Sequence, residues 1–311
     1  LVDLAEGDLG TAESHALRAF GVAKERVGQH SDPAALPASL LATIYYEWGR
    51  IEEARQYLDL ALPLVDECAV LDAVIHGYRT LARIQYLENS PGDALDTLAV
   101  AEVIGDRGNF PRLTVSILGQ RANFLIRMGD LEGASNVVDE MLSLAGRAEQ
   151  RRIDLWPRLH SVADLAKAKL LVATGAPEKG LRLIRDYAAM AEAAGRGQAL
   201  VEIRLLEALA DYRLGNNGAA IRRLSRALSE GRKGGLVRTF VDEGLELEPL
   251  FRAALNEWSG SRVAGPAWPD PEYLAQIAAA LEVGTGTVTP ADTPDADMDL
   301  DCLSGRETDV L

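Results

Sequence analysis

A pattern of small residues recurs along the chain at intervals of about forty positions. In each copy a small residue is followed by Gly or Asn seven positions later, and by a second small residue five positions after that. The copies are Ala42–Gly49–Ala54, Ala82–Asn89–Ala94, Ala122–Gly129–Ala134, Ala168–Gly175–Gly180 and Ala208–Gly215–Ala220, with a half-copy at Gly7–Ala12. The central positions lie 42, 40, 40, 46 and 40 residues apart. Such a period is typical of stacked units that share one continuous core.

Each copy has the features of two helices joined by a tight turn. Gly, or Asn89 in one copy, can adopt the left-handed conformation that ends a first helix. Asp8, Asp130 and the pair Ser90-Pro91 are candidates to begin a second helix. Apolar residues at helical spacing follow in each copy. The repeats therefore predict an all-α superhelix of antiparallel pairs, with about eleven to thirteen helices in this length of chain.

The composition agrees with helices packed through small and aliphatic side chains, because 48% of the residues are hydrophobic but only 5% are aromatic. The net charge of −15 opposes contact with a phosphate backbone, so we expect this part of the protein not to bind DNA itself. Two cysteines, Cys68 and Cys302, are too few for a disulfide framework, which favours the cytoplasm. No apolar run reaches the ~18 residues of a membrane span.

The repeat resembles the tetratricopeptide repeat. Its Gly-x-x-x-x-Ala turn, and the Ala seven residues before the Gly, match that family's spacing over roughly residues 1 to 235. The period is longer than the ~34 residues usual there and approaches that of HEAT and armadillo repeats. The resemblance implies tetratricopeptide-like pairs with lengthened helices. Residues 236–258 add one or two helices, so we predict a repeat domain over residues 1–258.

The remaining residues change character. Gly, Pro, Thr, Asp and Ser dominate residues 259–302, which we interpret as a linker with one possible short helix at 271–281, and we expect 284–301 to be mobile. Residues 303–311 resemble the opening of a LuxR-type helix-turn-helix domain, Leu-[Ser/Thr]-x-Arg-Glu-x-x-Val-Leu. Ser304 and Glu307 would form a capping box there. The resemblance implies that this domain is truncated at Leu311.

A further segment, Phe240-Val241-Asp242-Glu243-Gly244, resembles one that closes the repeat domain of maltose-activator-like LuxR-family regulators. That class has an ATP-binding module, a tetratricopeptide-like sensor and a C-terminal DNA-binding domain. The chain contains no Gly-x-x-x-x-Gly-Lys-[Ser/Thr] loop. We therefore expect no cofactor in this fragment. The ATP-binding module either lies outside it, as an N-terminal module of a parent protein, or is absent from that protein, and we expect DNA to be contacted only by the C-terminal domain.

No catalytic pattern stands out. The four histidines, His15, His30, His76 and His160, have no metal-ligand spacing such as His-Glu-x-x-His. Neither Gly-x-Ser-x-Gly nor Gly-x-Gly-x-x-Gly occurs. We predict that the chain is not an enzyme and holds no metal.

The tetratricopeptide resemblance also implies a binding groove. In such arrays the first helix of each pair lines the inner groove, and the positions just after the signature Ala point inward. A stripe of aromatic, Arg and Asn residues results, which suits a small polar or anionic ligand, or a peptide. The alternative is an ordinary polar surface. The candidate binding residues are Tyr46, Arg79, Arg83, Tyr86, Asn123 and Arg127.

Two functions fit these observations. The first is a regulatory domain that binds a small-molecule effector or a regulatory protein and controls a DNA-binding domain beyond Leu311. The second is a tetratricopeptide scaffold for a protein or peptide, with an accidental match at residues 303–311. Self-association is compatible with both, and neither involves a membrane.

Overall fold

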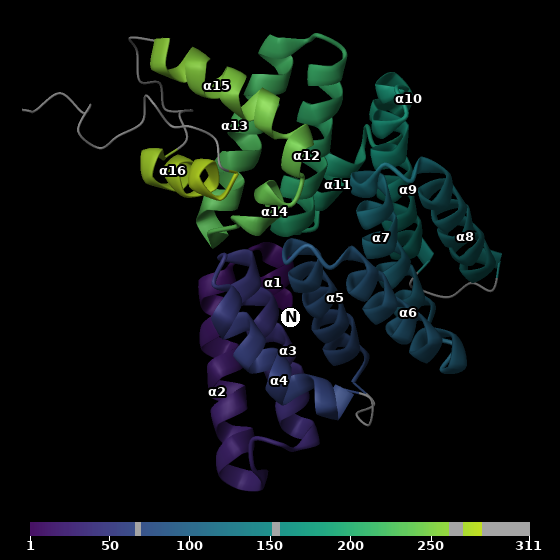
Figure 1. The fold of residues 1–311 in the computed structure, drawn as a ribbon, viewed down its shortest axis with the longest axis vertical. Helices are drawn as coiled ribbons and strands as arrows, with labels where there is room; N and C mark the ends of the chain where they lie inside the picture. Colours follow the sequence, from purple (N-terminus) through teal and green to yellow (C-terminus); the bar gives the residue numbers. More distant parts are fainter. Residues whose placement is uncertain (66–69, 151–155, 261–269, 282–311) are drawn as a thin grey trace, which may run out of the picture.

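The computed structural model describes residues 1–65, 70–150, 156–260 and 270–281, and all the regular structure within them is helical (Figure 1). The elements are α1 (Val2–Glu6), α2 (Leu9–Val27), α3 (Asp32–Glu47), α4 (Ile51–Val65), α5 (Leu71–Leu87), α6 (Pro91–Arg107), α7 (Pro111–Met128), α8 (Leu131–Gln150), α9 (Trp156–Ala173), α10 (Pro177–Leu183), α11 (Tyr187–Ala193), α12 (Gly197–Arg213), α13 (Asn217–Gly234), α14 (Arg238–Val241), the 3-10 helix η1 (Gly244–Glu246), α15 (Glu248–Gly260) and α16 (Pro271–Ala280). The predicted all-α repeat fold is thus confirmed.

The α-helices of the described ranges, α1 to α16, outnumber the eleven to thirteen expected from the repeats. The excess comes from short helices, since α1 has 5 residues and α14 has 4. The second helix of the fourth pair is also broken into two pieces of 7 residues each, α10 and α11.

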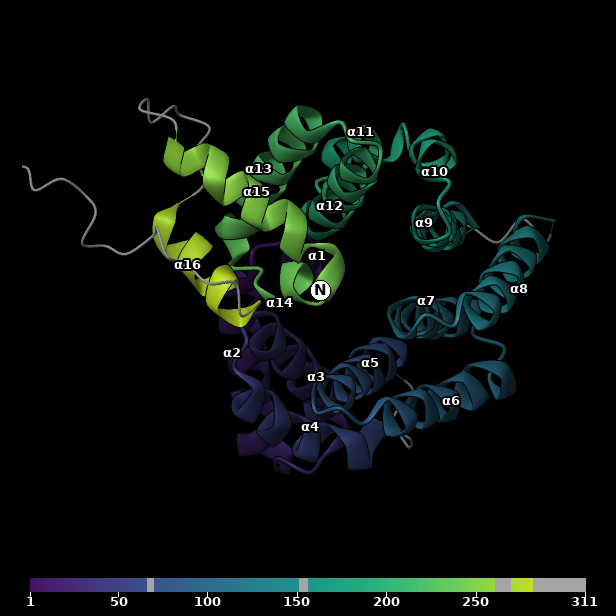
Figure 2. The same ribbon diagram turned by 45° about the horizontal axis from the view of Figure 1, so that its top comes forward.

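Five helix pairs follow the repeat signature: α3 with α4, α5 with α6, α7 with α8, α9 with α10 and α11, and α12 with α13. The first helices pack against one another in order, α3 on α5, α5 on α7, α7 on α9 and α9 on α12. The second helices lie outside them, so the first helices form the inner layer of a curved stack (Figure 2).

The turn within each pair has the predicted conformation. Gly129 ends α7 with a φ of 79°, and its N–H donates to carbonyl groups of the last helical turn. Asn89 replaces Gly in the second pair and still adopts a φ of 59°, a region that Asn tolerates better than most residues. The central glycines of the other copies, Gly7, Gly49, Gly175 and Gly215, also have positive φ.

A second helix begins directly after each of the three expected positions, Asp8, Ser90 and Asp130, and two of these residues make a capping hydrogen bond. The Asp8 carboxylate accepts a hydrogen bond from the Thr11 N–H at 3.0 Å, and the Asp130 carboxylate accepts one from the Gly133 N–H at 2.9 Å. Ser90 occupies the N-cap position of α6, as expected, although its hydroxyl makes no capping bond. Pro91 occupies the first helical position there, where its lack of an N–H removes one need for a cap.

The signature Ala residues let the helices approach closely. Those that precede the turn, Ala42, Ala82, Ala122, Ala168 and Ala208, are all fully buried. The fourth copy has Gly180 where the others have a second Ala. A Cβ atom at Gly180 would lie 3.0 Å from the Ala168 carbonyl oxygen, which is closer than most Cβ contacts in proteins. The small residues therefore set the distance between paired helices.

The two ends of the stack meet. Leu4 and Leu9, from α1 and α2, share one apolar cluster with Val201 and Leu205 of α12. The backbones touch here too, because a Cβ atom at Gly234 would lie 2.0 Å from the Gly7 carbonyl oxygen. In Figure 2, α12 and α13 return to α1 and α2. The superhelix thus closes into a ring.

The C-terminal helices cover this junction. The same apolar cluster includes Phe240, Phe251 and Ile277, from α14, α15 and α16. The rings of Phe240 and Tyr273 meet edge to face with centroids 6.3 Å apart. Helix α16 lies within residues 259–302, which the sequence assigns to a linker, and its apolar side is packed. The other parts of that span, 261–269 and 282–302, and the LuxR-like residues 303–311 lie outside the described residues.

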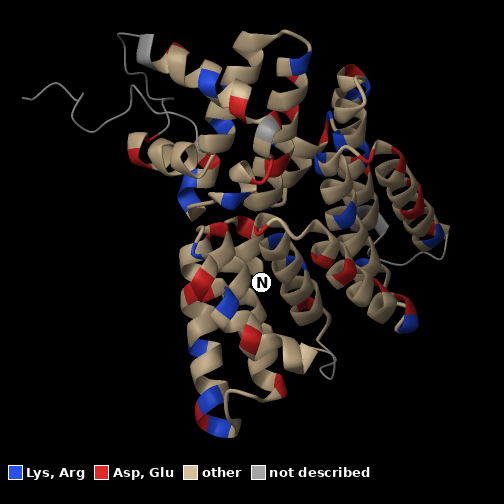
Figure 3. Ribbon diagram, viewed as in Figure 1, with Lys and Arg blue, Asp and Glu red and all other residues tan. Residues whose placement is uncertain are grey.

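No helix in the described ranges is long and apolar enough to span a bilayer. In the view of Figure 3, acidic and basic residues are interspersed along the helices, although the sequence as a whole carries a net charge of −15.

Candidate binding site

A short stretch that follows the last repeat lies against the inner layer of helices. We call residues 238–246 the acidic segment, because Asp242, Glu243 and Glu246 fall within them. It comprises α14 and η1, which are separated by a bend. The two consecutive acids, Asp242 and Glu243, form this bend, and Gly244 begins η1 with a φ of 58°, a conformation that most residues avoid.

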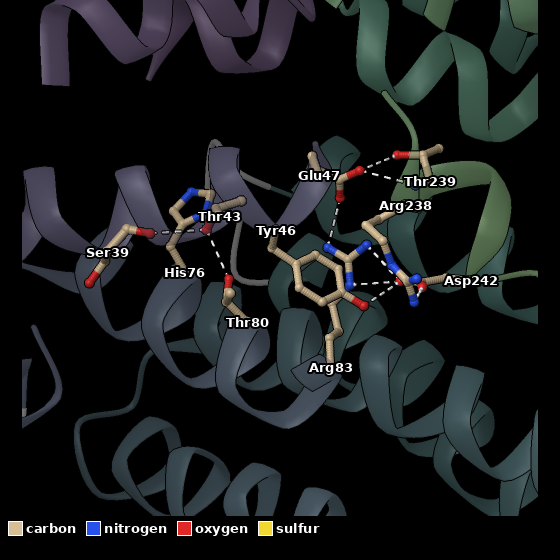
Figure 4. Close-up of polar contacts among 10 residues, drawn as sticks. All are labelled: Ser39, Thr43, Tyr46, Glu47, His76, Thr80, Arg83, Arg238, Thr239 and Asp242. Atoms are coloured by element: carbon tan, nitrogen blue, oxygen red, sulfur yellow. Dashed lines mark hydrogen bonds and ion pairs between the residues drawn. The ribbon is translucent and has the colours of Figure 1, made fainter. Parts of the chain in front are cut away.

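Arg83 and Tyr46 hold the first of these acids. The Nη2 and Nε atoms of Arg83 donate to Oδ2 of Asp242 at 2.9 and 3.2 Å, and the Tyr46 hydroxyl donates to the same oxygen at 2.9 Å (Figure 4). The Arg83 guanidinium also lies 4.2 Å from the centre of the Tyr46 ring. Charge-assisted hydrogen bonds and a cation–π contact therefore act on the same three side chains. Arg238, one turn before Asp242, forms a further ion pair with it.

Glu47 connects α3 to the start of α14. Its Oε2 accepts hydrogen bonds from the backbone N–H and the hydroxyl of Thr239, at 3.0 and 2.8 Å. Its Oε1 lies 2.8 Å from Nη1 of Arg83, and its backbone carbonyl accepts from the Val237 N–H at 3.0 Å. The Glu47 side chain is only 1% exposed. A carboxylate buried this deeply requires such partners, because an unpaired charge is costly away from water.

Two more acids of the segment meet cations of later repeats. Nζ of Lys169 donates to Oε1 of Glu243 at 2.8 Å. Glu246 pairs with Arg213, at the end of α12. The acidic segment therefore connects α3, α5, α9 and α12, which belong to four different repeats.

The electrostatics of this cluster favour ionised partners. Burial alone would raise the pKa of Asp242, but the guanidinium groups of Arg83, Arg238 and Arg127 together hold it below its ordinary value. Burial would lower the pKa of Lys169, but Glu243 and Glu202 raise it. Burial and the charge of Asp242 raise the pKa of Tyr46, so its hydroxyl stays a donor. The ion pairs are present at neutral pH.

A family model for the MalT-like TPR region, where TPR denotes the tetratricopeptide repeat, matches residues 2–257. The chain belongs to the MalT-like TPR family. The match begins in α1 and ends within α15, so the acidic segment lies inside the family's own region. None of the curated proteins compared with the chain matches it.

We call the side of the first helices that contacts the acidic segment the inner face of this MalT-like TPR region. It brings some sequence-predicted residues together and leaves others apart. Tyr46 and Arg83 meet at Asp242. Tyr86 and Arg127 form a separate pair, with the Arg127 guanidinium 4.4 Å from the centre of the Tyr86 ring. Tyr86 stacks in turn on Phe124, with ring centres 4.5 Å apart. Arg127 is exposed, so this pair faces solvent.

Arg79 keeps unused hydrogen-bonding capacity. Nε of Arg79 is buried without a hydrogen-bond partner among the described residues. Burial and the nearby Arg83 lower the pKa of Arg79, while Glu202 acts in the opposite direction. Burial raises the pKa of Glu202 even though it faces Lys169 and Arg79. Asn123 is partly buried.

Sequence reasoning missed the acids that complete the site. Asp242 and Glu243 were noticed only as part of a segment resembling a known one, and Glu202 was not singled out. The tetratricopeptide resemblance selects groove residues on the first helix of each pair, whereas Asp242 and Glu243 come from the stretch after the last repeat. Two consecutive acids before a Gly, beside a stripe of Arg residues one repeat apart, are the signal that could have found them.

A second polar cluster joins α3 and α5 beside the site. The Thr43 hydroxyl lies 3.2 Å from Nδ1 of His76 and 3.0 Å from the Thr80 hydroxyl (Figure 4). Burial, together with the positive charge of Arg79, lowers the pKa of His76 to about 3. His76 is therefore a neutral hydrogen-bonding partner at physiological pH.

The inner face is rich in paired charged side chains. Within the described ranges no three His, Cys, Asp or Glu side chains are grouped to hold a metal ion. The face instead offers guanidinium and ammonium groups beside aromatic rings, an arrangement suited to binding carboxylates. A TPR-like repeat domain of this kind is typically an interaction scaffold.

Proposed function

We propose that this MalT-like TPR region is the regulatory domain of a bacterial LuxR-family transcription regulator. In this proposal it binds a small-molecule effector or a regulatory protein, and the bound state controls a C-terminal DNA-binding domain. The family match over residues 2–257 carries the proposal. The resemblance of residues 303–311 to the opening of a LuxR-type helix-turn-helix supports it.

The proposed effector site is the inner face, with Tyr46, Arg79, Arg83, Tyr86, Asn123 and Arg127 as its residues. Arg79 supports this assignment because a buried guanidinium Nε without a partner is a costly arrangement that a ligand acceptor would relieve. The exposed Arg127 beside the Tyr86 ring supports it as well, since the pair offers a cation and a flat apolar surface to an incoming molecule.

The remaining partners follow from the same proposal. DNA is contacted only through the C-terminal domain, because this region is acidic and would repel phosphates. ATP binding belongs to an N-terminal module of the parent protein, and this region has no cofactor of its own. The protein acts in the cytoplasm, and self-association of the regulator is compatible with its role.

The reading frame downstream of Leu311 tests the regulatory role first. A complete helix-turn-helix there is expected, since a regulator of this kind reads bases with the second helix of that motif. A frame without such a domain would contradict the proposal.

The effector site is tested by thermal-shift screening of organic acids, sugars and cell extract. A ligand at 100 times its dissociation constant stabilises a fold by about 2.7 kcal/mol, which gives a visible shift. The variant Asn123→Ala with Arg127→Ala should lose this shift, while Arg252→Ala, on the exposed side of α15, should keep it. If the double variant binds equally well, the site lies elsewhere.

A second function, a scaffold for a peptide, is favoured by one observation. The inner face already holds a stretch of polypeptide, the acidic segment, through ion pairs with three repeats at Arg83, Lys169 and Arg213. Promoter binding by the parent protein separates the two functions. An effector should change it in a regulator, whereas a scaffold has no such response.

A further inference from the structure

The acidic segment has two sides with different roles. Phe240 is fully buried and Val241 is nearly so, and both belong to the apolar cluster that includes α13, α15 and α16. This side anchors the segment to the C-terminal part of the ring. The other side presents Asp242 and Glu243 to cations of α5 and α9. The two carboxylates thus contact the inner face in the way that the carboxylates of a bound ligand would, although they belong to the chain itself.

Where it contacts Asp242 and Glu243, the inner face should accept only negatively charged groups. The side chains of Arg83 and Lys169 are only 14% and 16% exposed. Without Asp242 and Glu243, Arg83 would keep only Glu47 as an ion-pair partner, and Lys169 would keep only the nearby charge of Glu202. Each cation would lose a direct carboxylate partner while remaining largely desolvated, which is unfavourable. A neutral or cationic molecule could not replace the two carboxylates. A molecule with two carboxylates close together could, because it would supply an acceptor to each cation.

We propose that the inner face binds a ligand with two neighbouring carboxylates, and that Asp242 and Glu243 are its built-in competitor. Ligand binding and release of the acidic segment are then one equilibrium, in which the segment lowers the apparent affinity for the ligand. This inference rests on the proposed function for its biological role, and it adds the class of ligand and the group that the ligand displaces.

Release of the segment has a defined structural consequence. The acidic segment leads directly into α15, and α16 packs on Phe240. Displacement would also break the bonds from Thr239 to Glu47 and the ion pair of Glu246 with Arg213. The ligand signal would therefore pass to the C-terminal helices.

The experiment compares dicarboxylate binding to the wild type and to the variant Asp242→Ala with Glu243→Ala. Calorimetry with succinate, with the capped peptide Asp-Glu-Gly and with acetate separates a small dicarboxylate, an acidic peptide and a single carboxylate. Sodium chloride at matched ionic strength controls for screening. Glu248→Ala with Glu257→Ala is the matched variant, since it removes the same charge from the outer surface of α15.

The expected result is that the Asp242/Glu243 variant binds succinate or the peptide at least tenfold more tightly than the wild type and the matched variant do, with acetate weaker. Adding Arg83→Met and Lys169→Met to it should abolish that binding. Equal affinity in all variants, or no binding by a folded Asp242/Glu243 variant, would overturn the competition.

If the double variant does not fold, hydrogen exchange in the wild type decides. Succinate or the peptide should speed exchange of the amides of residues 238–246, and an unchanged rate with both would overturn the proposal. A negative result in these experiments would overturn the competition but not the regulatory role, which is tested by the downstream reading frame and by promoter binding. Absence of a helix-turn-helix would contradict the regulatory role but not the competition between the ligand and the acidic segment.

Discussion

Arg83 and Asp242 lie 159 positions apart in the sequence, yet Nη2 of Arg83 donates to Oδ2 of Asp242 at 2.9 Å. This contact joins the second complete repeat to the stretch that follows the last one. In an open superhelix each repeat contacts only its neighbours, so stability is close to a sum of local terms. The Arg83–Asp242 contact makes this molecule different, because unfolding of either end removes contacts of the other.

Glu47→Ala should be among the most damaging single substitutions on the inner face. It removes the acceptor for the Thr239 N–H and hydroxyl and one carboxylate partner of Arg83. Loss of one partner from a buried ion pair costs about 3–5 kcal/mol. Urea denaturation monitored by circular dichroism measures the change in the free energy of unfolding.

Glu248→Ala is the control for this substitution. Glu248 also pairs with an Arg, Arg252, but on the surface of α15, with side chains 32% and 52% exposed. Exposed pairs contribute about 0–1 kcal/mol. Similar losses for the two variants would show that Glu47 is not held in a buried cluster.

Gly234→Ala should weaken the junction between the ends of the ring. The new Cβ atom would lie 2.0 Å from the Gly7 carbonyl oxygen, so the backbones must separate. We expect a loss of about 1–3 kcal/mol, as for other overpacked sites, with faster hydrogen exchange in α1. Gly146→Ala in α8 is the control, since no atom lies within 4 Å of its Cβ position, and it should be neutral or slightly stabilising. Equal stability of both variants would contradict ring closure.

His76 should make stability depend on pH. Its pKa is lowered to about 3 in the fold, against 6.5 for an ordinary histidine, and the charges that face it are those of Arg79, Asp72 and Arg112. Between these values the unfolded chain binds the extra proton, so stability falls as pH decreases from 6.5 towards 3. The slope is at most about 1.4 kcal/mol per pH unit.

Denaturation of His76→Gln across this range measures the contribution of His76. The variant should lose part of the wild-type slope, whereas His30→Gln, at an exposed position, should keep it. A slope that is the same in the wild type and in His76→Gln would contradict the neutral buried state of His76.

The sequence was sufficient for the local structure of the repeats. Gly129 and Asn89 predict left-handed turns because few other residue types adopt that conformation, and the recurring Ala residues predict close packing of the helices. The break between α10 and α11, and the uncapped start of α6 after Ser90, were not predictable. Residues 184–186, between α10 and α11, include no Gly or Pro that would mark the end of a helix.

Only those residues of the candidate site that lie on the repeat helices could be predicted from the sequence. The stripe from Tyr46 to Arg127 follows from the tetratricopeptide resemblance, which places these positions of the first helices on the groove, so its residues could be selected in advance. Its partners could not, since Asp242 and Glu243 approach from a segment that no repeat rule places. The sequence-based expectation was that Arg79, Arg83 and Arg127 would be solvated or bound to an external anion. For Arg83 the chain supplies that anion itself.

A double-mutant cycle on Arg83 and Asp242 tests the central claim most directly, namely that the acidic segment lies on the inner face of a closed ring. The free energy of unfolding is measured for the wild type, Arg83→Met, Asp242→Asn and the double variant. Because the two side chains are in contact, the double variant should lose at least about 1 kcal/mol less than the sum of the single losses. Losses that add to within about 0.3–0.5 kcal/mol would mean that the residues are distant, and that the inner face does not hold the segment.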